Sequence, residues 1–490
     1  MVRQCQTQST NAIGWQVVFH HDPEPVCVAS WEPPFAQPME RWPSGPKPIA
    51  WTPISRASLD SVDASPRRVS RGDSMKRYVL AVLAMVFLAG CGGGNGSDES
   101  GSAPANTGSA PASTIPGAGQ YPPAASANPT YIGTYAAVAG NNVVPVYFES
   151  GNSPTYNSNI PYIDVQICVP GTSQCVRVDH VQVDSGSTGL RIMKSALNGL
   201  TLPLQANTSG AQISECMAYA TSEVWGPVAR SDVYVGGEFG GNQTLQVIDD
   251  SDSASVPASC SSQGALTDTT SSFGGKGIIG INQLFSDGGS YYACTGTGCS
   301  QLDSSPVTVT NPVAGFAQDN NGVSIQIQPI SDLGATSASG QLIFGINTAS
   351  NNRIAGAAIL YTDKNGDLSV NTGTRTMPGF IDSGTASYFF PDDGSIPICS
   401  DNRNWYCPPS PISVNVDVIA GDASVDRPSS YRLSSYDSIS ADMEVAPTGE
   451  SGSVFNDGAS WYVLGLPFYI NRRVYGSIQQ SDSDPMYYAF

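Results

Sequence analysis

Two aspartates in the 490-residue sequence stand in nearly the same local setting. Asp184 lies in the string VQVDSGST, and Asp382 lies in the string GFIDSGTA, 198 residues further along the chain. Two carboxyl groups that are brought together cannot both ionise easily, so such a pair shares one proton. One carboxyl then serves as a base and the other as an acid. This chemistry activates a water molecule without a metal, a histidine or a covalent intermediate.

The residues that follow each aspartate can support this chemistry; they are Ser185, Gly186, Ser187, Ser383, Gly384 and Thr385. The glycines let the backbone turn sharply and approach the carboxylates closely. The serines directly after the aspartates can hydrogen-bond across the two halves. Ser187 and Thr385 can orient the outer carboxylate oxygens.

The wider surroundings of the aspartates repeat as well. Each is followed by an apolar-apolar-glycine string, which ends at Gly280 in the first half and at Gly465 in the second. These glycines stand 96 and 83 residues after their aspartates. Two halves of this kind, each with one aspartate where a strand meets a turn, imply two lobes related by a pseudo-twofold axis.

Histidine is too rare for most other hydrolytic schemes. The sequence has three, of which His20 and His21 lie in an upstream segment discussed below, so only His180 remains. Serine and cysteine hydrolases and histidine-rich metal sites depend on this residue. Beside Asp179, His180 is interpreted as a strand or surface residue. The cysteines form no C-x-x-C pair, which argues against zinc. The sequence therefore predicts no metal and no cofactor.

Composition excludes some partners and favours β-structure. The chain has 22 Lys+Arg against 41 Asp+Glu, a net charge of -19, so nucleic acid is a poor partner. From about residue 131, short β-branched or alternating runs are separated by Gly, Asn, Asp and Ser, which predicts an all-β fold. Helical periodicity is limited to residues 191–200 and 467–478. Asn365-Gly366 predicts a hairpin turn. A calcium loop at this point is the weaker alternative, because the closing glutamate is missing.

The sequence from Met75 predicts an exported chain. A short basic start is followed by the apolar run YVLAVLAMVFLAG, too short to span a bilayer, so residues 75–90 are expected to be a signal peptide. The run ends in Leu-Ala-Gly-Cys, which resembles the lipobox of bacterial lipoproteins and implies lipidation of Cys91. The alternative is a plain signal peptide with an incidental cysteine. Residues 91–130 are then the lipidated cysteine and a flexible linker.

Residues 1–74 precede this signal, where no folded domain belongs. They are rich in Pro, Arg and Trp and show no periodicity. We interpret them as an unstructured upstream extension and place the start of translation at Met75. A genuine cytoplasmic extension is the alternative.

Eight cysteines remain once Cys5, Cys27 and Cys91 are set aside. An even number in an exported chain predicts disulfides. Eight cysteines allow about a hundred connectivities. Pairing nearest neighbours gives Cys168–Cys175, Cys216–Cys260, Cys294–Cys299 and Cys399–Cys407.

The two aspartate strings resemble those of the pepsin-type aspartic peptidases, which carry an apolar-apolar-Asp-(Thr/Ser)-Gly-(Ser/Thr) motif in each lobe. Companion strings follow in the family's order over about residues 131–490: TSEVWG after Tyr219, then SDVYVGG, GIIG, GQLIFG and VLGLPFY. The resemblance implies a bilobal all-β fold with barrel-like lobes at residues 131–350 and 351–490 and a cleft between them. It also implies that Asp184 and Asp382 are catalytic, and that Tyr219 on a flap hairpin covers the substrate.

Arg191 departs from the pattern of that family. It stands where the family has an aromatic residue that hydrogen-bonds the flap tyrosine, and Ala220 and Ser222 replace glycines of the flap. Two roles for Arg191 remain open, contact with a carboxylate of the substrate and a structural ion pair.

Two functions follow from these observations. The string VDSGSTGLR also resembles one found in a family of bacterial lipoproteins without an assigned activity. The first hypothesis is an aspartic endopeptidase acting on peptide or protein substrates, held by a lipid at Cys91 in the bacterial cell envelope, at the outer membrane. The alternative is a non-catalytic binding or inhibitor lipoprotein that kept the fold.

Overall fold

The computed structural model describes residues 15–18, 26–29 and 135–490, apart from 150–157, 220–221, 251–255, 263, 355, 402–403, 452–459 and 482. The chain divides into two compact units, Met1–Pro66 and Arg67–Phe490. In the first unit, β1 (Trp15–Val18) pairs antiparallel with β2 (Val26–Ala29). The valines of these strands favour extended backbone. That residues 1–74 form an unstructured upstream extension stays a prediction. The signal peptide, Cys91 and the linker to residue 130 lie outside the described residues.

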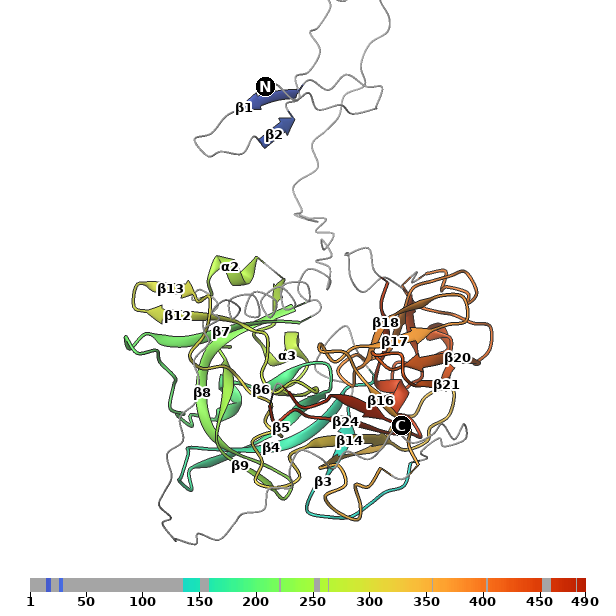
Figure 1. Ribbon diagram of the computed structural model, residues 1–490, viewed down its shortest axis with the longest axis horizontal. Helices are drawn as coiled ribbons and strands as arrows, with labels where there is room; N and C mark the ends of the chain where they lie inside the picture. Colours follow the sequence, from blue (N-terminus) through green and yellow to red (C-terminus); the bar gives the residue numbers. More distant parts are fainter. Residues whose placement is uncertain are drawn as a thin grey trace, which may run out of the picture. The chain divides into compact units, whose positions relative to one another are not determined.

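The first lobe is a closed β-barrel with additional strands. Its strands are β4 (Pro161–Cys168), β5 (Cys175–Asp184), β6 (Thr188–Met193), β7 (Gln212–Ala218), β8 (Ser222–Val235), β9 (Glu238–Ile248), β10 (Ala265–Leu266), β11 (Gly277–Ile281), β12 (Ser290–Thr295) and β13 (Gly298–Gln301). Six of them pair in the order β8-β9-β6-β11-β5-β4, and β4 pairs with β8 again, which closes the ring. Figure 1 shows these strands in teal to yellow-green.

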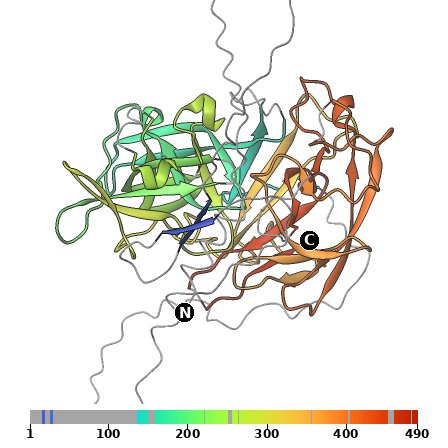
Figure 2. The same cartoon turned by 90° about the horizontal axis from the view of Figure 1, so that it is seen from above.

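A connecting sheet continues from β4 toward the second lobe. Its strands, in the order of pairing, are β3 (Val143–Phe148), β15 (Ser339–Phe344), β14 (Gly322–Ile327), β24 (Arg473–Ser477), β25 (Tyr487–Ala489) and β16 (Ile359–Tyr361). Because β24 and β25 come from the end of the chain, this sheet joins the last residues to strands of the first half. Figure 2 shows the first lobe and the orange-to-red second lobe on either side of these strands.

The second lobe repeats the strand arrangement around the first aspartate. Its strands are β17 (Leu368–Asn371), β18 (Thr376–Ile381), β19 (Tyr388–Phe390), β20 (Ile412–Ile419), β21 (Asp426–Leu433), β22 (Gly449–Ser451) and β23 (Tyr462–Leu464). β18 runs parallel to β23 and β19 antiparallel to it, just as β5 and β6 do on β11. The predicted fold class, all-β with two similar lobes, is confirmed.

Two glutamines bind the segment that leads into β3. Gln326 on β14 and Gln341 on β15 lie opposite each other, and their side chains are joined by a 2.8 Å hydrogen bond. Gln326 donates to the carbonyl oxygen of Ala136 at 2.8 Å, and Gln341 donates to that of Val138 at 2.8 Å. The neighbouring Ile325 points to the opposite face, since side chains alternate along a strand, and there it lines a cavity beneath the first aspartate turn.

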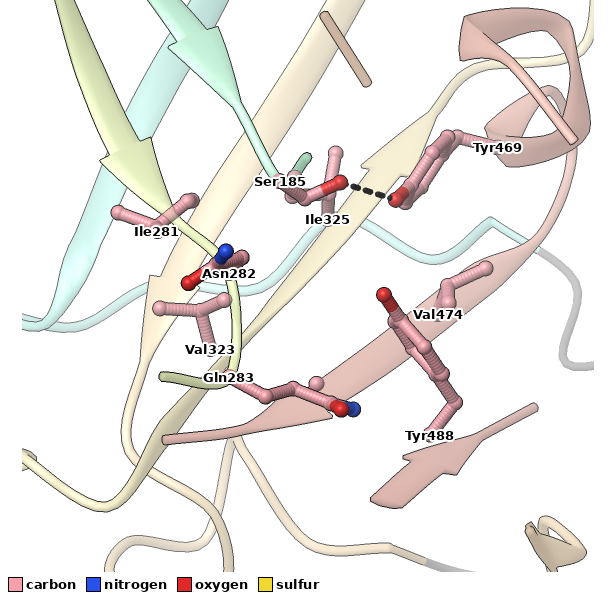
Figure 3. A pocket seen from close by; sticks show the side chains of 10 residues that line it. Ser185, Ile281, Asn282, Gln283, Val323, Ile325, Tyr469, Val474 and Tyr488 are labelled. Atoms are coloured by element: carbon pink, nitrogen blue, oxygen red, sulfur yellow. Dashed lines mark hydrogen bonds between the residues drawn. The ribbon is translucent and has the colours of Figure 1, made fainter. Parts of the chain in front are cut away.

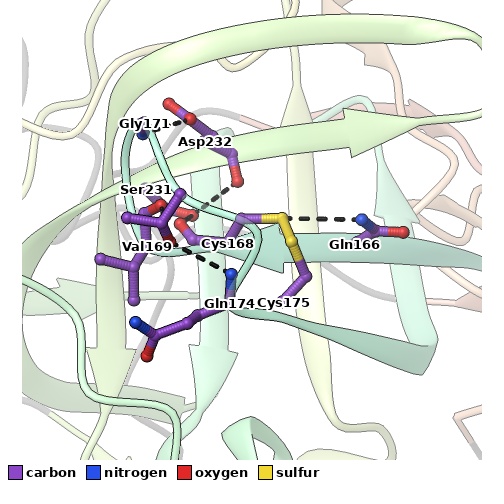
Figure 4. Close-up of a disulfide and its surroundings, with 9 residues drawn as sticks. Gln166, Cys168, Val169, Gly171, Gln174, Cys175, Ser231 and Asp232 are labelled. Atoms are coloured by element: carbon purple, nitrogen blue, oxygen red, sulfur yellow. Dashed lines mark hydrogen bonds between the residues drawn. A yellow bond between two sulfur atoms is a disulfide. The ribbon is translucent and has the colours of Figure 1, made fainter.

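All four predicted disulfides are present. Cys168 and Cys175 face each other across the β4–β5 ladder (Figure 4), and Cys294 and Cys299 do so between β12 and β13. Cys216–Cys260 joins β7 to α2 (Ala258–Ser261), and the fourth bond joins Cys399 to Cys407. For Cys168–Cys175 and Cys294–Cys299, nearest-neighbour pairing succeeds because a hairpin places cysteines that are close in sequence on opposing strands. Cys216–Cys260 spans 44 residues and does not follow from this rule.

Helices in the described residues are single turns: α2, α3 (Thr270–Phe273), η1 (Lys194–Leu197), η3 (Tyr436–Ser438) and η4 (Leu466–Tyr469). None of the described helices is long and apolar enough to cross a membrane. The predicted helix at 191–200 is reduced to η1. The one at 467–478 is wrong beyond η4, because pairing with β14 makes residues 473–477 a strand.

The turn at Asn365-Gly366 forms, with Gly366 in the left-handed region at φ 87°. The predicted hairpin is nevertheless wrong. The turn joins β16 and β17, and these strands pair into different sheets.

Candidate active site

Asp184 and Asp382 occupy equivalent places in the two lobes. Asp184 ends β5, and Asp382 directly follows β18. Each of these strands runs parallel to an inner strand, so that Gly280 of β11 lies beside Asp184 and Leu464 of β23 lies beside Ile381. The chain then turns and returns along the other side of the same inner strand. The repeated sequence therefore builds a repeated strand-turn-strand unit.

The glycine that ends each apolar string makes room for the aspartate turn. A Cβ atom on Gly280 would lie 2.8 Å from the carbonyl oxygen of Ser187, and one on Gly465 would lie 2.6 Å from that of Thr385. The main-chain N–H of Asn282 also donates to the Ser187 oxygen at 2.9 Å, and that of Leu466 donates to the Thr385 oxygen at 2.8 Å. The two glycines therefore fix both turns against their inner strands.

Each carboxylate accepts the same two hydrogen bonds from its own turn. The main-chain N–H of Gly186 donates to Asp184 Oδ1 at 2.7 Å, and the Ser187 hydroxyl donates to Oδ2 at 2.5 Å. In the second lobe Gly384 and Thr385 make the corresponding bonds to Asp382, at 2.7 and 2.5 Å. Ser187 and Thr385 thus hold the outer carboxylate oxygens in the way that the sequence suggested.

Ser185 and Ser383 join the two lobes, and we call this pair the serine bridge. The N–H of Ser185 donates to Ser383 Oγ at 3.0 Å, and the N–H of Ser383 donates to Ser185 Oγ at 2.9 Å. The hydroxyls donate onward to the carbonyl oxygens of Val183, at 2.9 Å, and Ile381, at 3.3 Å. Both aspartate turns are thus fixed relative to each other.

The turns bring the two carboxyl groups into direct contact. A Cβ atom on Gly186 would lie 2.6 Å from Asp382 Oδ1, and one on Gly384 would lie 2.5 Å from Asp184 Oδ1. The Asp184 and Asp382 side chains lie within hydrogen-bonding distance of each other. They are 6% and 4% exposed, while Gly186 beside them is exposed to solvent. The pair is therefore nearly desolvated but close to the surface.

Tyr219 lies at the tip of the β7–β8 hairpin, where its N–H donates to the carbonyl oxygen of Ser222 at 2.7 Å. Its half-buried ring packs edge-on against Phe273, with 6.4 Å between ring centroids. The guanidinium of Arg191 is within electrostatic reach of its hydroxyl. The hairpin predicted for the flap is thus present, although residues 220–221 lie outside the described part of the chain.

Arg191 is wholly buried, with 0% of the residue exposed. Its Nη2 donates to Glu215 Oε1 at 2.7 Å and to Asp287 Oδ2 at 2.6 Å, and Nη1 donates to the carbonyl oxygen of Thr188 at 2.6 Å. The suggested contact with a substrate carboxylate is wrong, because the side chain offers no exposed atom. Arg191 instead forms a buried ion pair with Glu215 and Asp287. Its contact with Glu215 links β6 to β7.

A family model described as "Protein of unknown function (DUF3443)" matches residues 138–490. The chain belongs to the DUF3443 family. No curated protein matches it. Among solved structures it is similar to an aspartic proteinase from Irpex lacteus, with a TM-score of 0.41 and 14% identity over 71% of this chain and 96% of that one.

Three further residues line a cavity beside Ser185 in this DUF3443 protein and were not expected from the sequence. The hydroxyl of Tyr469 lies 2.9 Å from Ser185 Oγ, and the hydroxyl of Tyr488 donates to the carbonyl oxygen of Ile381 at 3.2 Å. Gln283, like both tyrosines, lines the cavity beneath the first aspartate turn. Tyr469 belongs to the string VLGLPFY, which is the one feature of the sequence that could have singled it out. The helix predicted at residues 467–478 gave no reason to place its hydroxyl beside Ser185.

Among the residues that the structure describes, no other titratable group forms a metal-binding cluster with the pair. His180 contacts Glu149 Oε2 at 2.9 Å and Asp179 Oδ1 at 3.3 Å. In the part of the chain that the structure describes, the two clusters compact enough to share an ion are Cys216/Glu223/Cys260 and Cys399/Cys407/Asp437. Each contains a disulfide, so neither offers three free ligands.

Burial and the neighbouring Asp382 carboxyl raise the pKa of Asp184 from 3.8 to about 8. The hydrogen bonds from Ser187 and Gly186 act in the opposite direction but do not cancel this effect. Asp184 therefore keeps its proton at neutral pH. A carboxyl group that is protonated beside a second carboxyl can supply the acid of an acid–base pair.

We expect this raised pKa to make the stability of the fold fall as pH rises. The folded protein keeps the Asp184 proton up to about pH 8, whereas the unfolded chain releases it near 3.8. The folded state binds more protons in that interval, so the free energy of unfolding decreases from about pH 4 to about pH 8 by at least about 2 kcal/mol. Urea unfolding across this range, compared with Asp184→Asn, isolates the contribution, because other titrating groups are common to both proteins. Equal slopes in the two proteins would contradict the assignment.

The close approach at Gly186 predicts a strong effect of one added methyl group. In Gly186→Ala the new Cβ would lie 2.6 Å from the Asp382 carboxyl, which has to move. For an enzyme using this pair, a shift of this kind lowers kcat/KM about a hundredfold. Gly296→Ala is the matched control, because a Cβ there meets nothing within 4 Å. Equal activity of the two variants would show that the carboxyl positions do not matter.

Proposed function

We propose that this protein is an aspartic endopeptidase, which hydrolyses peptide bonds with a water molecule activated by Asp184 and Asp382. The observation that carries the proposal is the contact of the two carboxyl groups, each oriented by its own turn and joined by the serine bridge. Nothing in a purely structural role requires two acidic side chains to be held together at the cost of a raised pKa.

The chemistry follows from one proton held by the pair. The unprotonated carboxylate takes a proton from a water molecule while the protonated carboxyl gives its proton to the oxygen of the peptide carbonyl. The water oxygen forms a bond to the carbonyl carbon. The C–N bond then breaks as the carboxyl that took a proton from water gives it to the leaving nitrogen. The other carboxylate takes a proton back from a hydroxyl of the tetrahedral intermediate, so the carbonyl re-forms and the pair again holds one proton. No covalent bond to the protein is formed.

The exposed turn at Gly186 gives a polypeptide access to the pair. Tyr219 on its hairpin is proposed to close over the bound segment and exclude water. The alternative, a non-catalytic binding protein, would gain support from an Arg191 side chain that fills the substrate site. The complete burial of Arg191 removes that support.

Location in the bacterial cell envelope, with a lipid at Cys91 and attachment at the outer membrane, forms part of the proposal. It is supported by the signal-like run and the Leu-Ala-Gly-Cys string. The disulfides of the folded domain are consistent with an oxidising compartment.

The test is incubation of the purified, disulfide-intact protein with a peptide library from about pH 3 to about pH 9, with products identified by mass spectrometry. We expect cleavage at defined peptide bonds, in the pH range in which the pair holds one proton. Absence of cleavage by a protein whose circular dichroism shows the folded β-structure would overturn the proposal and favour the binding role.

A further inference from the structure

A small cavity lies beside Ser185 of the serine bridge (Figure 3). Its volume is about 10 Å³, room for a single water molecule. Apolar side chains of β11, β14 and β24 form much of its wall. The polar residues at its wall are Ser185, Asn282, Gln283, Tyr469 and Tyr488. The amide oxygen of Asn282 already accepts from Thr188 Oγ1 and Leu284 N.

Gln283 reaches this cavity from the segment after β11 and is only 2% exposed. Its Oε1 accepts a hydrogen bond from Thr362 Oγ1 at 3.1 Å. Within the described residues, Nε2 of Gln283 finds no acceptor. A buried N–H group left without an acceptor costs about 1–3 kcal/mol, so an acceptor is needed at this position.

The two tyrosines offer acceptors. The hydroxyl of Tyr488 donates its hydrogen to the carbonyl oxygen of Ile381. Ser185 Oγ accepts from Ser383 N and lies 3.3 Å from the same carbonyl oxygen and 2.9 Å from the Tyr469 hydroxyl. When Ser185 donates to the carbonyl, Tyr469 is the donor to Ser185. Both tyrosine hydrogens are thereby used, and each phenolic oxygen keeps a lone pair for an incoming donor.

We propose that the cavity binds one water molecule, which accepts a hydrogen bond from Gln283 Nε2 and donates to the hydroxyl oxygens of Tyr469 and Tyr488. One donor and two acceptors match the two hydrogens and the lone pairs of water, and three bonds are typical of buried water. The proposal stands on the cavity and its lining, and it is independent of the proposed peptidase activity.

Such a water molecule has a positioning role. The water molecule donates a hydrogen bond to each tyrosine oxygen, so neither tyrosine hydrogen points into the cavity. The Tyr469 hydrogen is then directed to Ser185, and the Ser185 hydrogen is directed to Ile381. It also connects Gln283, which follows the inner strand of the first lobe, to two tyrosines from the end of the chain. The bound water molecule therefore sets the direction of the Ser185 hydroxyl hydrogen.

The experiment is a pair of crystal structures at about 1.5 Å, one of the protein and one of Gln283→Met, which removes the donor with little change of side-chain volume. We expect one isolated peak of electron density within hydrogen-bonding distance of Gln283 and both tyrosine hydroxyls, and its loss in the variant. A cavity without density in the parent overturns the proposal. A peak that persists in Gln283→Met overturns the assignment of its donor.

Tyr406→Phe is the matched control. Tyr406 is 1% exposed, and its hydroxyl donates to the carbonyl oxygen of Phe390 at 3.1 Å, so its loss removes one buried hydrogen bond elsewhere in the second lobe. The water peak is expected to remain in that variant. If Gln283→Met does not fold, Tyr488→Phe provides the second test, since loss of one acceptor weakens the peak. Oxygen-17 relaxation dispersion gives the solution measurement: the count of long-lived water molecules falls by about one in Gln283→Met.

Discussion

Replacement of either Asp184 or Asp382 by Asn is expected to lower kcat/KM for peptide cleavage at least about a thousandfold. An amide can neither take the proton of the attacking water nor give a proton to the carbonyl oxygen as a carboxyl does. Because the two residues act as one pair, the double variant is expected to be no worse than either single variant. The measurement is initial-rate kinetics on a peptide that the parent cleaves.

Asp392→Asn is the control for these variants. Asp392 stands in the same kind of Asp-x-Gly turn, with Oδ1 accepting from Gly394 N at 2.8 Å, but its side chain is exposed. Its substitution should leave cleavage unchanged. Activity that survives in both Asp184→Asn and Asp382→Asn would show that another group performs the hydrolysis.

Replacement of Arg191 by Met is expected to lower the free energy of unfolding by about 3–5 kcal/mol. The substitution leaves Glu215 and Asp287 close together, buried and without their cation. Burial already raises the pKa of Glu215 well above its ordinary value while Arg191 is present. Without the arginine, at least one of the two acids has to bind a proton in order to fold. The loss should therefore be greatest at high pH. Urea unfolding at two pH values measures it.

Arg432→Met separates this effect from the general loss of an arginine. Arg432 also makes two hydrogen bonds to a carboxylate, that of Asp332, but both side chains are more than 40% exposed. An exposed ion pair contributes about 0–1 kcal/mol. Similar losses in Arg191→Met and Arg432→Met would mean that burial of the first ion pair has no energetic consequence.

The sequence predicts best those features in which neighbours in the chain are also neighbours in space. The aspartate turns are determined by a few consecutive residues, so the roles of Ser187 and Thr385 could be assigned from the string alone. The disulfides of hairpins follow for the same reason. The serine bridge could be expected because the internal repeat supplies the symmetry that brings Ser185 to Ser383.

Features that depend on which strands meet could not be predicted. Arg191 finds Glu215 and Asp287 only because β6, β7 and the loop before β12 come together. Local pattern also misled at residues 467–478, where apolar spacing suits a helix. Pairing of β24 with β14 dominates there, because it satisfies the backbone hydrogen bonds of both strands.

The attachment of Ala136 and Val138 to Gln326 and Gln341 fixes where the chain enters the domain. These bonds hold the incoming chain against the side of the connecting sheet that is turned away from Asp184 and Asp382. If, as proposed, Cys91 carries a lipid, the anchor is connected to the domain on the side opposite the two aspartates.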